Sequence, residues 1–140
     1  MANKRRMVSS AITGSDSFLA LPLTAQALYY HFADNGADDD GIVGAPLMIT
    51  RAIGATKKDL EALISARFLL AFPSGRVVIK HWLIHNAIRK DRYTPSTYTE
   101  ERAAIKVKPE NRAYTLNGEG IPLPEWQPNG NQMATTGCRR

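Results

Sequence analysis

The stretch that decides the fold is RVVIKHWLIHNAIRKDRY, residues 76–93. It begins with three branched apolar residues between Arg76 and Lys80, which is typical of a buried strand with a basic rim. A short apolar segment follows and ends in three cations and Tyr93. A core strand joined directly to clustered Arg and Lys side chains is typical of small domains that bind nucleic acid.

This strand is expected to be the second arm of a hairpin. Residues 68–72 form another apolar run just before it, and Pro73, Ser74 and Gly75 stand between the two. Two such runs joined by a short Pro- and Gly-containing segment predict antiparallel strands over residues 68–72 and 76–82.

Ahead of the hairpin, the spacing of apolar residues predicts three helices. The first begins after Pro22, and the second begins at Pro46 and stops at Gly54. The third begins at Thr56, where Asp59 completes a variant capping box. A helix, a turn that contains glycine and a second helix of this length make a helix-turn-helix pattern.

A brief strand, residues 42–43, is expected between the first two helices. Three helices, a small strand and a hairpin in this order predict an α+β fold: a winged helix-turn-helix with three helices plus a small antiparallel sheet. Leu47 is expected to face inward. The expected core positions are the apolar residues on the inward faces: Leu28, Phe32, Ile49, Ile53, Leu60, Ile64, Phe68, Val77 and Ile79.

The expected winged helix spans residues 15–93, preceded by an irregular basic arm over residues 1–14. Residues 94–116 are expected to be a C-terminal extension with one short helix, which begins around Thr99 and runs through Ile105 ahead of Pro109. Gly, Pro, Asn, Gln and Thr dominate residues 117–140, which predicts a disordered tail.

Charge is distributed unevenly along the chain, whose formal net charge is +5. Residues 7–50 hold five aspartates and no Lys or Arg, whereas residues 51–92 hold nine cations and three carboxylates. This asymmetry predicts a positive face and a negative face, and an anionic partner for the former. The alternative is an ordinary scatter of solvated charges.

The composition indicates a reducing compartment. Cys138 is the sole cysteine, so no internal disulfide framework exists. No apolar run reaches membrane-spanning length, and the basic residues near the start are not followed by a signal-peptide core. The expectation is a cytoplasmic protein without a membrane partner.

Four segments together resemble the N-terminal domain of bacteriophage replisome organisers, in the order of that family: LPLTAQALY at 21–29, DDDG at 38–41, VIKHW at 78–82 and IRKDRY at 88–93. The resemblance covers residues 3–116. It implies a winged-helix domain that binds double-stranded DNA at a phage replication origin. Longer members carry a further C-terminal domain that engages host helicase-loading proteins, and such a domain would be absent from a chain that stops at Arg140.

The first candidate DNA contacts lie on the helix-turn-helix. Lys57 and Lys58 occupy the first turn of the third helix, and Arg51 lies at the end of the preceding one. Cations at a helix N-terminus oppose the helix dipole and are unfavourable there without an anion. This favours contact with DNA phosphates or the major groove, and the alternative is ordinary solvated lysines.

The wing strand supplies two more candidates. Arg76 and Lys80 share one face of it, with Val77 and Ile79 on the other. A wing would direct Arg76 at a phosphate or the minor groove. The alternative is an edge strand that its charges protect against aggregation.

Arg89, Lys90, Arg92 and Tyr93 complete the set of DNA-binding candidates. They follow the wing strand, so they are expected to lie close to the wing and to grip phosphates, with Tyr93 packed against the domain or a sugar. The alternative is a favourable interaction of the cations with the C-terminal end of a short helix.

The sequence contains no catalytic or metal-binding pattern that would favour another function over DNA binding, so neither an enzyme nor a cofactor is expected. The acidic residues 38–40 are expected to form a turn, since a calcium loop in this register would place Gly36 and Leu47 at its first and last ligands. Two other functions stay open: a prophage transcriptional regulator, or a protein-interaction module, including a homodimer, without DNA binding.

Overall fold

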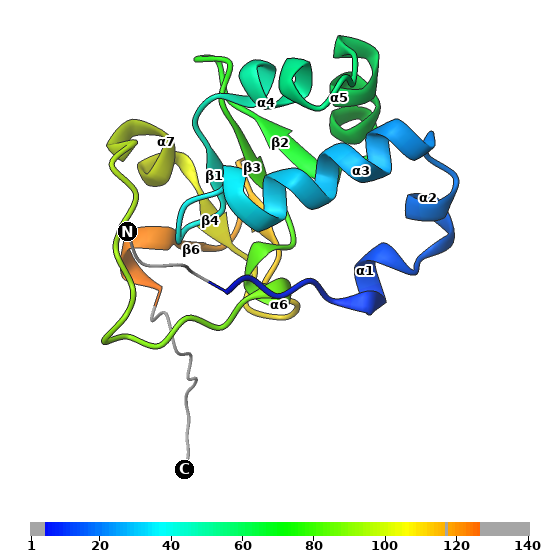
Figure 1. The fold of residues 1–140 in the computed structure, drawn as a ribbon. Coiled ribbons are helices and arrows are strands. Elements are labelled where there is room, and N and C mark those ends of the chain that lie inside the picture. The colour runs from blue at the N-terminus through cyan, green and yellow to red at the C-terminus, as the bar shows by residue number, and fades with distance from the viewer. Residues whose placement is uncertain (1–4, 117, 127–140) are drawn as a thin grey trace.

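The computed structural model describes residues 5–116 and 118–126 and shows a mixed α+β fold with two three-stranded antiparallel sheets (Figure 1). The expected α+β class is confirmed. The helices are α1 Ser10–Thr13, α2 Asp16–Leu19, α3 Leu23–His31, α4 Pro46–Ala52, α5 Lys57–Ser65, α6 Trp82–His85 and α7 Thr99–Ala104, with a π-helical turn η1 Phe32–Gly36 and a 3-10 turn η2 Leu123–Glu125. The strands are β1 Ile42–Val43, β2 Leu69–Ala71, β3 Val77–Ile79, β4 Lys106–Val107, β5 Tyr114–Thr115 and β6 Ile121–Pro122.

The first sheet has the strand order β1-β3-β2, so β3 lies in its centre. The hairpin pairs Leu70 with Val78, and β1 pairs Val43 with Val77 on the other side of β3. All three residues of β3 are buried, which requires cover on both faces of the sheet because successive side chains alternate between them. The edge-strand explanation for Arg76 and Lys80 is therefore wrong.

The core lies between this sheet and helices α3 and α5. The rings of Tyr29 and Phe68 each lie 5.2 Å from that of Phe18 in edge-on geometry. The burial expected from the sequence is confirmed for Leu28, Phe32, Leu60, Phe68, Val77 and Ile79, whereas Ile49, Ile53 and Ile64 are only partly buried.

The inward position expected for Leu47 is wrong, because its side chain is 41% exposed. Helix α4 buries Pro46 and Thr50 and packs Ile49 and Ile53 against the core. These four residues form one stripe at helical spacing, and Leu47 lies about 100° around the helix from Pro46, outside that stripe.

Residues 38–41, here called the acidic turn, connect η1 to β1. Asp39 forms an ion pair with Arg6 at 2.9 Å and accepts a hydrogen bond from the backbone N–H of Thr94. Its carbonyl oxygen accepts from the Trp82 indole at 2.9 Å. Gly41 has a φ of +86°, and a Cβ there would lie 2.6 Å from the Trp82 ring, so only glycine fits.

Asp40 is the most heavily bonded residue of this turn. Its carboxylate accepts from the Tyr93 hydroxyl at 2.5 Å, from the Ser96 backbone N–H at 2.9 Å and from Arg102 Nε at 3.1 Å. The Tyr114 hydroxyl donates to its carbonyl oxygen at 2.8 Å. Asp39 and Asp40 are both buried, so these two of the five N-terminal aspartates do not contribute to the expected negative face, whereas Asp16 and Asp34 are exposed.

The N-terminal arm was expected to be irregular over residues 1–14, which is wrong for Ser10–Thr13, since these form α1; the residues just before α1 are irregular but anchored. The Ser9 N–H donates to Nδ1 of His85 at 2.9 Å, and the Met7 N–H donates to Asn86 at 2.8 Å. Ser9 then caps α1. These hydrogen bonds join the N-terminal arm to the α6 region, which is far away in the sequence, so local sequence cannot predict them.

The second sheet has the order β5-β4-β6 and belongs to residues after α7. The short helix expected through Ile105 is confirmed: α7 ends at Ala104 with Ile105 as its C-cap, and the chain enters β4 before it reaches Pro109. The expected tail is wrong for residues 118–126: β6 pairs with β4, and Leu123 is 4% exposed. The prediction of disorder came from the Gly- and Pro-rich composition, and composition does not indicate that a single leucine of such a segment is buried and holds it in place. Residues 117 and 127–140 lie outside the described residues.

Candidate nucleic-acid interface

Helices α4 and α5 are joined by a tight turn that the sequence specifies locally. The Gly54 N–H donates to the Arg51 carbonyl, and the Ala55 N–H donates to the Thr50 carbonyl, which together form a Schellman motif. Gly54 has a φ of +81°, and a Cβ there would meet nothing within 4 Å. Backbone conformation, and not crowding, therefore explains this glycine.

Asp59 fixes the start of α5. Its Oδ2 accepts from the Thr56 backbone N–H at 2.9 Å, and its Oδ1 accepts from the Thr24 hydroxyl of α3 at 2.8 Å. The hydrogen bond from the Thr56 backbone lowers the pKa of Asp59, with further contributions from Thr24 and Thr56 side chains. One buried carboxylate thus caps the helix and ties it to α3.

The neighbouring cations point outward. Arg51, Lys57 and Lys58 are exposed and gathered around this turn, and they are here called the α4–α5 cations. In the part of the chain that the structure describes, no carboxylate forms an ion pair with any of them. Exposed cations around a rigid helix-helix turn are suited to contact the phosphates of a nucleic acid.

Arg76, expected to reach DNA from the wing, is held within the protein instead. Its Nη1 lies 2.9 Å from Glu101 of α7, which also accepts from the Ser74 hydroxyl at 2.7 Å. The guanidinium lies 4.3 Å from the ring centre of Tyr98. The hydrogen bonds from Ser74 and then Arg76 hold the pKa of Glu101 below its usual range.

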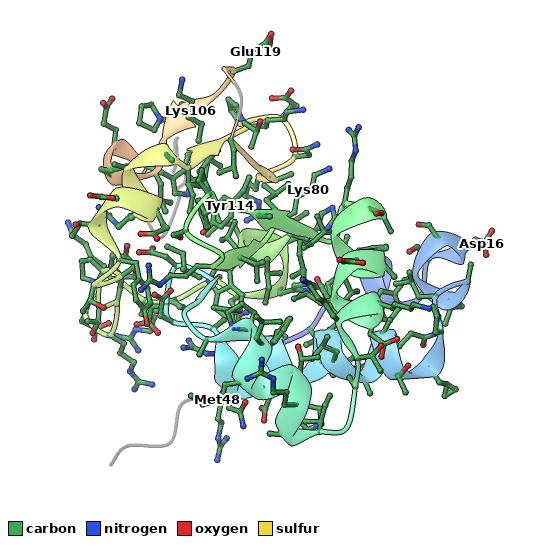
Figure 2. All side chains as sticks on the ribbon, turned by 90° about the horizontal axis from the view of Figure 1, so that it is seen from above. Asp16, Met48, Lys80, Lys106, Tyr114 and Glu119 are labelled. Carbon is green, nitrogen blue, oxygen red and sulfur yellow. The ribbon has the colours of Figure 1, made fainter. Side chains whose placement is uncertain are left out.

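Lys80 lies apart from the α4–α5 cations. It lines an open groove together with Arg67, which follows α5, and Lys108, which follows β4. In Figure 2, Lys80 and Tyr114 lie in the middle of the molecule, with Met48 of α4 toward one margin and Glu119 at the other. Arg67 and Lys108 were not among the DNA-binding candidates predicted from the sequence, because only the fold brings the three cations together.

Arg89, Lys90 and Arg92 were expected close to the wing, and this placement is wrong. Helix α6 carries the chain away from the hairpin turn, and the loop that follows runs along the lower end of the molecule, opposite α4 and α5 (Figure 1). Arg89 forms an exposed ion pair with Asp91 at 3.2 Å. Tyr93 packs against the domain through Asp40, and burial raises its pKa.

The nine candidates therefore occupy four places. Arg51, Lys57 and Lys58 share one surface; Arg76 is paired with α7; Lys80 lines the groove; and the remaining four belong to the lower loop and the Asp40 network. The described residues contain no group of three or more His, Cys, Asp or Glu side chains that could hold a metal ion. Within the same residues, no helix is long and apolar enough to cross a membrane.

Comparisons with protein-family models, with curated proteins and with solved structures found no match to this chain. The inference of function therefore depends on the geometry and on the residues themselves.

Proposed function

We propose that this protein binds duplex DNA through a winged helix formed by α3, α4, α5 and the β1-β3-β2 sheet. The observation that carries the proposal is the cluster of α4–α5 cations, Arg51, Lys57 and Lys58, which are exposed and have no ion-pair partner among the described residues. Helix α5 would present its N-terminal end to the major groove or its flanking phosphates.

The arrangement of elements supports this proposal. The order of elements is that of a winged helix: a helix is followed by a short strand, then by two helices joined by a tight turn, and then by a hairpin. The hairpin turn lies toward the same end of the molecule as α4 and α5 (Figure 1). A duplex docked on the α4–α5 cations would therefore have the hairpin tip within its reach, although Arg76 itself is engaged by Glu101.

The role in the cell follows from the resemblance to phage replisome organisers and is proposed on that basis. The protein would bind a phage or prophage replication origin in the cytoplasm. Its DNA-binding surface would serve a transcriptional regulator equally well, since the fold does not fix the function. Selection of bound fragments from phage and host genomic DNA separates the two: recovery of origin-type repeats supports replication, and recovery of a single operator-like site near a promoter supports regulation.

The direct test is the double substitution Lys57→Ala with Lys58→Ala. Duplex affinity is expected to fall, and the slope of log affinity against log salt is expected to flatten by about 0.9 per lost phosphate contact. Binding is measured by fluorescence anisotropy over a range of salt concentrations.

The matched control removes the same charge from the opposite end, by Lys90→Ala with Arg92→Ala. If both pairs weaken binding equally, net charge and not the α4–α5 surface explains the affinity. If the Lys57 and Lys58 variant keeps the parental slope, the proposed interface is wrong.

A protein-interaction module is the second candidate, and one observation favours it. Leu47 and Met48 on α4 are 41% and 68% exposed, beside the α4–α5 cations. Sedimentation of the protein with and without duplex DNA separates the candidates. A dimer that Met48→Ser dissociates, together with no DNA binding, would replace the proposal.

A further inference from the structure

A second basic surface lies at the other end of α5. The groove lined by Arg67, Lys80 and Lys108 has a volume of about 600 Å³ and is open to solvent. Sites for small ligands commonly measure about 300–1,000 Å³, so its size suits a nucleotide-sized group. Its three cations follow α5, β3 and β4, respectively, so the packing of the second sheet against the first creates the site.

The groove lining carries three cations and one carboxylate, so its charge is positive. Within residues 5–116 and 118–126, none of the three cations forms an ion pair. Burial, with smaller contributions from the charges of Lys108 and Arg67, holds the pKa of Lys80 below its usual range. Glu119 also lines the groove but pairs with none of them.

The backbone at Arg67 gives an independent indication. Arg67 has a φ of +66°, in the left-handed region that a side chain adopts at a cost. Its N–H donates to Ile64 and the next N–H donates to Leu63, the Schellman pattern that Gly54 completes after α4. Glycine or asparagine would satisfy the same cap with less strain, so the cap does not require an arginine, whose charge also interacts favourably with the C-terminal end of α5.

The remaining lining defines what the groove would bind. Leu70 and Leu116 provide apolar walls, and the Tyr114 ring is almost fully buried, so the described lining presents no aromatic face on which a base would stack. We propose that this groove binds phosphate, carried by a nucleotide or by the backbone of a single nucleic-acid strand, with Arg67 and Lys108 as the contacts and Lys80 between them.

This site is distinct from the proposed duplex interface and does not rest on it. Helix α5 has nine residues and is therefore about 13 Å long, with Lys57 and Lys58 at its start and Arg67 just beyond its end. A duplex docked at one end of α5 would leave the groove at the other end accessible. The two proposals can consequently fail separately.

The test uses three probes on the full chain at low salt. Titration calorimetry with sodium triphosphate and with dTTP measures free phosphate compounds, and anisotropy with a labelled oligothymidylate measures a strand. Equal binding of triphosphate and dTTP without the oligonucleotide assigns the groove to free phosphate compounds, and tighter binding of the oligonucleotide assigns it to a strand. If no probe binds, the proposal is overturned.

Arg67→Gly separates a functional arginine from a structural one. Because glycine relieves the left-handed backbone, the melting temperature is expected to stay the same or rise, while binding weakens roughly tenfold. Lys108→Gln is expected to weaken binding similarly, and the Lys90→Ala, Arg92→Ala variant, which removes two exposed cations outside the groove, is the control that keeps it. Binding that survives Arg67→Gly and Lys108→Gln but is lost in the control would overturn the assignment.

Discussion

The acidic turn and the α4–α5 turn both carry dense charge, but they use it in opposite ways. Asp39 and Asp40 are buried, and Arg6, Arg102 and the backbone N–H groups of Thr94 and Ser96 satisfy them. The α4–α5 cations, by contrast, are exposed and have no ion-pair partner among the described residues. Buried and paired charge holds the fold together, whereas exposed and unpaired charge is available to a ligand.

This difference separates charges that report on folding from charges that report on binding. A substitution in the acidic turn should change stability first, because it leaves buried partners unsatisfied. A substitution among the α4–α5 cations should change binding and leave stability nearly unchanged.

The largest expected effect is that of Asp40→Ala. It leaves Arg102 without its carboxylate and removes the acceptor for Tyr93 and the Ser96 N–H, so it should cost about 3–5 kcal/mol of unfolding free energy. Urea unfolding measures this, with exposed Asp34→Ala as the control. A loss below about 1 kcal/mol would show that the acidic turn is not the anchor that its contacts indicate.

Acid should loosen the same end of the molecule through His85. Its Nδ1 accepts from the Ser9 N–H, so the neutral ring carries its proton on Nε2 and directs it at the Tyr29 hydroxyl, 2.6 Å away. Burial, with a smaller contribution from His81, lowers the pKa of His85 from 6.5 to about 4. The unfolded chain therefore binds more protons between these values, and stability should fall as pH falls through that window, by at most about 3 kcal/mol.

His85→Gln isolates this contribution, because it should be less stable at pH 7 and should flatten the pH dependence of urea unfolding over the same window. His31→Gln, at an exposed position, is the control. The isolation is needed because burial also lowers the pKa of His81 to about 4, which adds to the effect over the same window, and raises the pKa of Asp38, which works in the opposite direction. An unchanged slope in His85→Gln would contradict the assignment.

A smaller effect is expected from Asp59→Ala. Asp59 is itself a buried, hydrogen-bonded charge, and it lies in the first turn of α5 beside the exposed Lys57 and Lys58. The substitution removes the cap on Thr56 and the bond from Thr24, for a cost of about 1–2 kcal/mol. Because α5 would then be held less firmly, duplex affinity should also fall when measured on the folded fraction. Asp59→Asn keeps one acceptor, so it should retain part of the unfolding free energy and part of the duplex affinity. A loss of stability without a loss of affinity would show that α5 can bind DNA without being fixed by Asp59.

The smallest effect is expected from replacing Arg89, Lys90 and Arg92 by Gln. These side chains are exposed, and a surface pair such as that of Arg89 with Asp91 contributes little, so stability should change by less than about 0.5 kcal/mol. Because they lie opposite α4 and α5, affinity for specific and random duplex DNA should fall slightly and equally. A large loss of duplex binding would mean that the DNA-binding surface extends to the lower loop and is not confined to the α4–α5 cations.

The sequence alone predicted the elements whose causes lie within a few residues. The capping of α5 by Thr56 and Asp59, the start of α4 at Pro46 and its end near Gly54, and the hairpin around residues 73–75 are all confirmed. Each depends on hydrogen bonds or backbone preferences between near neighbours, which sequence spacing encodes.

Tertiary structure alone decided which charges are used and where they lie. Nothing near Arg76 in the sequence indicates Glu101, and nothing near Asp40 indicates Arg102; each pair joins segments that meet only when residues 94–126 fold over the first sheet. The same packing buries both faces of β3 and gathers Arg67, Lys80 and Lys108 into one groove. An ionic contact depends on distance in space, and sequence spacing fixes that distance only within a turn or a helix.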